Sequence, residues 1–268
     1  MDKAVILARG LGTRMRKADD SAELTHEQRK MAEVGVKAMI PIDRPFLDYV
    51  ISSLADAGYK RVCLVIGPEH TAVRDYYGRL DCKRVTIDFA IQEKPLGTAD
   101  AVAAAEQFAA DDNFLVINSD NYYPPEAFAT LGKLKSAGLA GFERSAMLAG
   151  SNIEPERIAK FAIIEIDDDG FMKHILEKPT PQQLAAAKEP VCLSMNCWRF
   201  TKKIFEACRH IKPSARGELE IPDAVQYAIN NLGEKFKVAV MKAAVLDMSS
   251  RKDVGPIAAK LKGTEVRL

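Results

Sequence analysis

A glycine-rich loop near the start of the chain carries the first residues whose types and spacing could do chemistry. The apolar run at residues 4–8 is followed by Gly10 and Gly12 and then by Arg14 and Arg16. Glycine lets backbone amides approach a ligand closely, and arginine can form two parallel hydrogen bonds with a phosphate group. A purely structural turn needs neither arginine. The loop is therefore predicted to bind an anionic ligand.

Neither of two common phosphate-binding motifs explains this loop. It lacks the lysine followed by serine or threonine that ends a P-loop, and it lacks the third glycine of the dinucleotide fingerprint. The arginines at positions 14 and 16 also have no role in a dinucleotide site. A dinucleotide-dependent oxidoreductase is therefore a weak alternative.

The first 120 residues alternate strand candidates with amphipathic helix candidates. The strand-like runs cover residues 4–8, 61–67, 85–92 and 113–120. This alternation predicts a mainly parallel sheet with helices on both faces. Ligands bind to such sheets beyond the carboxyl ends of the strands. Residues that directly follow each run are therefore candidates for a functional site.

The second half of the chain predicts an antiparallel addition to this sheet. Two strand-like runs meet at Asp169-Gly170, which indicates a hairpin, and further runs lie at residues 191–200 and 236–248. No repeat or low-complexity linker divides the chain, so one domain over residues 1–268 is expected. The predicted fold class is α/β: a Rossmann-like, mixed but mainly parallel sheet flanked by helices, with a small antiparallel elaboration on the substrate side.

Residues 17–35 are highly charged and separate the glycine loop from Lys37. Two interpretations stay open for this stretch. It could form a short solvated helix, or it could form a mobile lid over a bound ligand, because long loops in compact domains often have functions.

Composition limits the class of protein. The chain has 268 residues, 47% of them hydrophobic, which is enough to bury a sizeable core. The net charge of +1 gives no general attraction to nucleic acid or membranes, and no apolar run approaches the roughly 20 residues of a membrane span. Five cysteines without a Cys-x-x-Cys pair predict free thiols. We expect a cytoplasmic protein that binds neither nucleic acid nor membranes.

Several further motifs follow the glycine loop in order. They are KAMIP from Lys37, QEKPLGTADAV from Gln92, VINSD ending at Asp120, LEKP around Lys178, and ARGELEIPDAV around Arg216. Together with the loop sequence GLGTRMR, they resemble the motifs of the sugar-1-phosphate nucleotidyltransferases over residues 3 to about 255. The ARGELEI segment is similar to glucose-1-phosphate thymidylyltransferases, whereas PLGTADAV is more similar to ADP-glucose and mannose-1-phosphate enzymes.

The resemblance implies transfer of a nucleotidyl group from a nucleoside triphosphate to a sugar-1-phosphate, with release of pyrophosphate. It implies a nucleotide-binding half at about residues 1–120 and a sugar-phosphate-binding half at about residues 121–268. Because two anions must meet, Mg²⁺ is the expected cofactor, with Asp120 and Asp247 as its ligands. Members of this family are commonly oligomeric, which leaves a homo-oligomer open for this chain.

The resemblance also assigns residues to roles. Phosphoryl transfer asks a protein mainly for positioning and charge stabilisation. The expected catalytic residues are Arg14, Lys37, Asp120 and Lys178. The expected nucleotide-binding residues are Leu7, Gly10, Leu11, Gly12, Thr13, Gln92, Gly97 and Thr98. The expected sugar-phosphate-binding residues are Glu177, Lys178, Asn196 and Arg216.

Three departures from the family pattern leave the specificity open. Arg9 stands where alanine or glycine is common, Asn196 stands where glycine is usual, and residues 248–250 replace Thr-Gly-Thr. The departures at Arg9 and around Asp247 motivate an alternative, a non-catalytic regulatory protein that binds nucleotide sugars. Gln92 and ARGELEI favour dTTP or UTP with glucose-1-phosphate or a similar hexose-1-phosphate, while GTADAV keeps ATP and GTP open.

Overall fold

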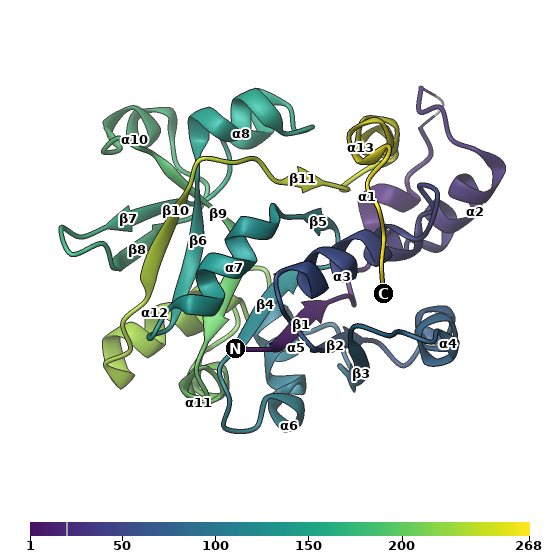
Figure 1. Cartoon of the computed structure of the whole chain (residues 1–268). Helices are drawn as coiled ribbons and strands as arrows, with labels where there is room; N and C mark the ends of the chain where they lie inside the picture. The colour runs from purple at the N-terminus through teal and green to yellow at the C-terminus, as the bar shows by residue number, and fades with distance from the viewer. Residues whose placement is uncertain (20) are drawn as a thin grey trace.

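A nine-stranded mixed sheet forms the centre of the computed structural model, which describes residues 1–19 and 21–268 (Figure 1). Along its main path the strand order is β10-β6-β9-β4-β1-β2-β3, and the β7–β8 hairpin attaches at β9. The strands are β1 Lys3–Leu7, β2 Arg61–Ile66, β3 Thr86–Ile91, β4 Phe114–Asn118, β5 Asn121–Tyr122, β6 Gly138–Glu143, β7 Ile163–Ile166, β8 Met172–Leu176, β9 Cys192–Phe200, β10 Lys237–Met241 and β11 Leu246–Asp247.

Helices cover both faces of this sheet (Figure 1). The α-helices are α1 Thr13–Arg16, α2 His26–Val34, α3 Phe46–Asp56, α4 Thr71–Arg79, α5 Thr98–Ala104, α6 Glu106–Ala109, α7 Pro125–Lys133, α8 Arg144–Gly150, α9 Pro155–Ile158, α10 Pro181–Ala186, α11 Lys203–His210, α12 Ile221–Leu232 and α13 Val254–Leu261. Two 3₁₀ helices, η1 Lys37–Met39 and η2 Arg251–Asp253, complete the set of named helices in the described part of the chain.

The four predicted strands of the first half form one parallel part of the sheet. β6 and β10 also pair in parallel, although the second half was predicted to be antiparallel. β1 pairs in parallel with β2 and β4, and β2 pairs in parallel with β3. Alternate residues of β1 enter two separate cores: Ala4 and Ile6 pack into one, and Val5 packs into the other. Burial on both faces explains the continuous apolar runs in the sequence. The predicted fold class is confirmed.

The antiparallel part joins the two halves of the chain. β9 pairs antiparallel with β4 on one side and with β6 on the other. β7 and β8 form the predicted hairpin, in which Gly170 has a φ of 78°. Positive φ is readily adopted by glycine, which explains its place in this turn. β11 leaves the main sheet and pairs with β5 near the carboxyl end of β4.

The charged stretch at residues 17–35 contains α2. Thr25 caps this helix through a capping box with Gln28, and Gly35 ends it with a φ of 81°. The structure therefore contains the expected helix at residues 26–34, and the lid interpretation stays a prediction. Asp20 lies outside the described residues. In the described part of the chain, no helix has the length and apolar character needed to cross a membrane.

Candidate active site

A cleft of about 530 Å³ lies beyond the carboxyl ends of β1, β3 and β4. The sheet positions this cleft, because parallel strands deliver the residues after their carboxyl ends to one edge. The predicted site residues that line it are Leu7, Gly10, Leu11, Thr13, Arg14, Lys37, Gln92, Gly97, Thr98, Asp120 and Arg216. Residues from five separate motifs of the sequence therefore meet around one cavity.

The two loop glycines differ in what the fold requires of them. Gly12 has a φ of 61°, and a Cβ there would lie 2.1 Å from the backbone oxygen of Gly35, so the fold requires glycine at this position. A Cβ at Gly10 would meet no protein atom within 4 Å. Gly10 therefore leaves open space at the lining of the cleft, where a ligand can approach the backbone.

Lys37 and Asp120 form an ion pair in the cleft. The Lys37 Nζ lies 2.7 Å from Asp120 Oδ2, and the two side chains are partly buried, with exposed fractions of 15% and 26%. η1 presents the lysine, and the short turn between β4 and β5 presents the aspartate. The sequence predicted both residues as catalytic, and the structure places their charged atoms in direct contact.

Asp247 lies beside this pair on β11. It is opposite Asn121 of β5, and the Met248 N–H donates a 2.8 Å hydrogen bond to the backbone oxygen of Asp120. The Asp247 side chain is only 12% exposed. Burial and the nearby Asp120 carboxylate raise the pKa of Asp247 to about 6, against the opposing effects of Arg157 and Lys37. The two predicted metal ligands therefore lie close enough to repel each other.

A loop around Gly97 connects the two halves of the chain. Gly97 has a φ of 121° and packs directly against the backbone of Leu219, in the ARGELEI segment. The Ala99 N–H donates to the Leu219 oxygen at 2.9 Å, and the Ile221 N–H donates to Thr98 Oγ1 at 2.9 Å. These contacts hold Arg216 at the cleft, where its guanidinium pairs with Glu220 at 2.6 Å.

The comparisons with known proteins agree with this geometry. The model of the nucleotidyl transferase family matches residues 3–262. The chain belongs to this family. Glucose-1-phosphate thymidylyltransferase of Streptomyces antibioticus is 31% identical over 229 residues, which are 85% of this chain and 58% of that protein. The low-salt glycan biosynthesis nucleotidyltransferase Agl11 of Haloferax volcanii is 30% identical, over 84% of this chain and 56% of that protein.

The nucleotidyltransferase chain spans about half the length of the first curated relatives that it matches. The crystal structure of a UDP-glucose pyrophosphorylase complexed with UDP-glucose has a TM-score of 0.74 and 19% identity to it, and the match covers 99% of this chain and 100% of that one. This likeness shows that the fold is shared. The family predicted from the motifs is confirmed.

Not every predicted site residue of the nucleotidyltransferase reaches the cleft. Of the predicted site residues, five are absent from its described lining: Gly12, Glu177, Lys178, Asn196 and Asp247. Glu177 still lies close enough to Arg216 and Lys178 to feel their charges. Burial, together with the Glu220 carboxylate, raises the pKa of Glu177, and the two cations oppose this rise. Of the predicted sugar-phosphate residues, Glu177 and Lys178 therefore lie near Arg216, which itself lines the cleft.

Lys178 and Asn196 share an uncommon backbone conformation. Their φ values are 47° and 55°, in the left-handed region that few residues other than glycine adopt. Asn196 Oδ1 accepts a 3.3 Å hydrogen bond from the indole N–H of the buried Trp198. Its amide nitrogen donates to no group among the described residues. Asparagine can therefore replace the usual glycine at this position and still offer a donor.

Arg9 also differs from the expected alanine or glycine. Its guanidinium is buried and lies 3.3 Å from the Glu69 carboxylate, while its Nη1 has no hydrogen-bond partner among the described residues. Arg9 contributes to the lining of the cleft. An ion pair with Glu69 keeps this charge next to the glycine loop.

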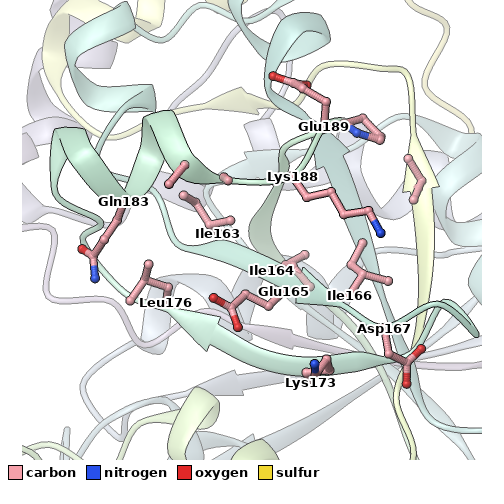
Figure 2. Close-up of a pocket in the computed structure, with 14 residues that line it drawn as sticks. Ile163, Ile164, Glu165, Ile166, Asp167, Lys173, Leu176, Gln183, Lys188 and Glu189 are labelled. Atoms are coloured by element: carbon pink, nitrogen blue, oxygen red, sulfur yellow. The ribbon is translucent and has the colours of Figure 1, made fainter.

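A second hollow of about 650 Å³ lies between α10 and the β7–β8 hairpin. Figure 2 shows the isoleucine side chains of β7 at one wall and Lys188 reaching across the hollow. Its walls include Ile163, Ile164 and Leu176. Although it is larger than the cleft, no predicted site residue lines it. We therefore place the functional site in the cleft at the strand ends.

Arg157 is the main site residue that sequence reasoning missed. It lies on α9, and its guanidinium pairs with Asp247 and, at 3.4 Å, with Asp253. Asn121 Nδ2 donates to the other Asp247 oxygen at 3.0 Å. An arginine in the polar segment EPERIAK has no periodicity or motif that would place it beside a carboxylate distant in sequence.

Substituting this arginine tests its electrostatic role. Arg157→Gln is expected to lower the free energy of unfolding by about 2 kcal/mol, because two buried carboxylates lose their shared cation. Urea denaturation followed by circular dichroism measures this loss. Arg209→Gln, which breaks the exposed pair with Glu106, is the matched control and should change stability by less than about 1 kcal/mol. Equal effects of the two substitutions would contradict the role given to Arg157.

Proposed function

We propose that this nucleotidyltransferase joins a nucleoside triphosphate to a sugar-1-phosphate and releases pyrophosphate. The favoured substrates are dTTP or UTP with glucose-1-phosphate or a similar hexose-1-phosphate. The observation that carries the proposal is the meeting of Arg14, Lys37, Asp120 and Arg216 around one glycine-lined cleft. Two relatives support the choice of substrates: the glucose-1-phosphate thymidylyltransferase of Streptomyces antibioticus and the UTP–glucose-1-phosphate uridylyltransferase AglF of Haloferax volcanii.

The proposed reaction is an in-line displacement at phosphorus. A phosphate oxygen of the sugar-1-phosphate forms a bond to the α-phosphorus, and the bond from that phosphorus to the bridging oxygen of pyrophosphate breaks. The leaving group carries away the electron pair and its negative charge. Arg14 and Lys37 hold the triphosphate and stabilise this charge, which is the main task of a protein in phosphoryl transfer.

The sugar phosphate enters from the side of the ARGELEI segment. Arg216 reaches the cleft from this side, and Glu177 lies near it. Lys178 and Arg216 supply positive charge for the phosphate. Glu177 and Asn196 supply hydrogen bonds for sugar hydroxyls, since a carboxylate accepts and the Asn196 amide nitrogen donates.

The residues present fit a magnesium ion. Mg²⁺ prefers oxygen ligands and commonly takes only one or two protein carboxylates, together with water and substrate phosphates. Asp120 and Asp247 offer two such carboxylates, whose mutual repulsion a cation would relieve. In the described part of the chain, no group of three or more histidine, cysteine or acidic side chains could hold a metal. When bound, Mg²⁺ would neutralise phosphate charge at the reacting centre.

Pyrophosphate release tests the proposed function directly. The purified protein is mixed with Mg²⁺, one of five nucleoside triphosphates and one of a panel of sugar-1-phosphates. We expect release to require one particular pair, which would name both substrates. Nucleotide-sugar binding with no turnover for any pair would instead support the alternative, a non-catalytic regulatory protein.

Lys178 provides a test of the sugar-phosphate side. Lys178→Ala is expected to raise the KM for the sugar-1-phosphate at least tenfold and to leave the KM for the nucleotide nearly unchanged, because only one substrate loses a cation. Steady-state kinetics with each substrate varied in turn measures both values. Lys173→Ala, on the exposed face of β8, is the control. An unchanged KM for the sugar phosphate would remove Lys178 from the site.

A further inference from the structure

The side chain of Gln92 is held in one orientation in the lining of the cleft. Gln92 directly follows β3 and is only 4% exposed. Its amide nitrogen donates two hydrogen bonds, at 3.0 Å to the backbone oxygen of Gly97 and at 2.7 Å to Asp100 Oδ2. A backbone oxygen and a carboxylate oxygen can only accept, so the amide cannot be reversed without losing both bonds.

Gln92 can therefore offer a ligand only a hydrogen-bond acceptor. Both hydrogens of its amide nitrogen are used, and Gln92 Oε1 accepts no hydrogen bond from the described residues. Oε1 is also absent from the buried polar atoms that lack a partner within the described chain, so this oxygen is accessible, and Gln92 lines the cleft. A ligand group that meets this oxygen must donate an N–H or an O–H.

A free donor lies close to this acceptor. The backbone N–H of Gly97 donates to no group among the described residues, and Gly97 lines the same cleft. Its carbonyl already binds Gln92, which brings the two residues together. Gln92 and Gly97 thus present an acceptor beside a donor. A base edge with a ring N–H next to a carbonyl oxygen matches this pair.

We propose that Asp100 is a positioning residue that fixes Gln92 as an acceptor and thereby selects uracil or thymine over cytosine. This inference rests on the proposed function and specifies its nucleotide. Uracil and cytosine have nearly the same shape, but uracil carries N3–H beside O4, where cytosine carries an N3 lone pair beside an amino group. At cytosine N3, two acceptors would face each other, and at its amino group, two donors.

Asp100 lies in the first turn of α5, next to the fixed loop around Gly97. Through this placement, one carboxylate on the helix controls which atom of Gln92 faces the cleft. Replacing Asp100 by alanine removes one of the two bonds that hold the amide. The freed amide can then turn and donate to cytosine N3, so the preference between the two pyrimidines should weaken.

The test compares the affinities of UTP and CTP by isothermal titration calorimetry, together with kcat/KM in pyrophosphate release. The wild-type protein should bind UTP roughly 30-fold more tightly than CTP, a difference that one mismatched buried hydrogen bond can produce. Asp100→Ala should reduce this ratio to about fivefold or less. Asp100→Asn should keep the ratio, because the asparagine oxygen can still accept from Gln92.

Two further measurements keep the test valid even if Asp100→Ala fails to fold. Wild-type protein should bind 3-methyl-UTP roughly 30-fold more weakly than UTP, since the methyl group removes the N3–H. Asp88→Ala is the control for loss of a carboxylate. Asp88 lies on β3, the strand that directly precedes Gln92, and its partly exposed side chain pairs with Arg61. This control should leave the UTP to CTP ratio unchanged.

The outcomes separate this inference from the proposed function. Equal affinity of the wild-type protein for UTP and CTP, or an unchanged ratio in Asp100→Ala, would overturn the role of Asp100. Turnover with any nucleoside triphosphate would leave the proposed function in place in that case. Absence of both nucleotide binding and turnover in the wild-type protein would overturn both.

Discussion

Replacing Asp120 by asparagine is expected to lower kcat by about 10³-fold and to leave the fold intact. Asparagine keeps the shape of the side chain but removes its negative charge. Asp120 stands where the Lys37 ammonium and the Asp247 carboxylate meet, so the substitution removes both the partner of the lysine and one proposed ligand of Mg²⁺. Because the side chain lies at the surface of the cleft, its loss should cost little stability.

The measurement is pyrophosphate release with saturating substrates, accompanied by a thermal melt of the same preparation. Asp88→Asn, which removes a half-exposed carboxylate on β3 that lies outside the cleft, controls for the loss of one negative charge. We expect normal kcat in this control. A near-normal rate for Asp120→Asn, with a normal melting temperature, would remove Asp120 from the catalytic machinery and would weaken the proposed site as a whole.

The parallel half of the fold could be predicted because its local signals agree with its tertiary structure. The apolar runs around Ala4, Leu64 and Val116 are continuous, since both faces of these strands are buried. Parallel strands deliver the residues that follow them to one edge. This rule alone places Gln92 and Asp120 near the glycine loop, and the structure confirms that they line one cleft.

Pairings between distant side chains could not be predicted in the same way. No local sequence pattern indicates the ion pair between Lys37 and Asp120 or the ion pair between Arg157 and Asp247. Each requires two loops to approach through the packing of other elements. The hydrogen bond from Gln92 to Asp100 joins residues that are close in the sequence. It depends on the turn at Gly97, which the periodicity of strands and helices does not predict.

The left-handed residues show a second limit of sequence reasoning. The sequence marked Asn196 as a departure from glycine, but it could not show that the backbone keeps a glycine-like φ there. Asparagine tolerates this conformation better than most residues do. An asparagine at position 196 therefore adds a polar side chain while the glycine-like backbone path is kept.

Gly97 is where a single methyl group should disturb both halves of the molecule. A Cβ at this position would lie 2.4 Å from the backbone oxygen of Leu219, and the φ of 121° is strained for any other residue. Neither backbone segment can move freely, because Gly97 also binds Gln92 and the Leu219 segment carries Arg216. We expect Gly97→Ala to lower the free energy of unfolding by about 3 kcal/mol.

The same substitution should weaken nucleotide binding at least tenfold, because moving the loop shifts Gln92 and the free N–H of Gly97 together. Urea denaturation and calorimetric titration of the nucleotide measure the two effects. Gly255→Ala in α13 is the matched control, since a Cβ there meets no protein atom within 4 Å, and it should raise or preserve stability. If Gly97→Ala proved as stable as this control, the tight contact between the loop and Leu219 could not be what holds Arg216 at the cleft.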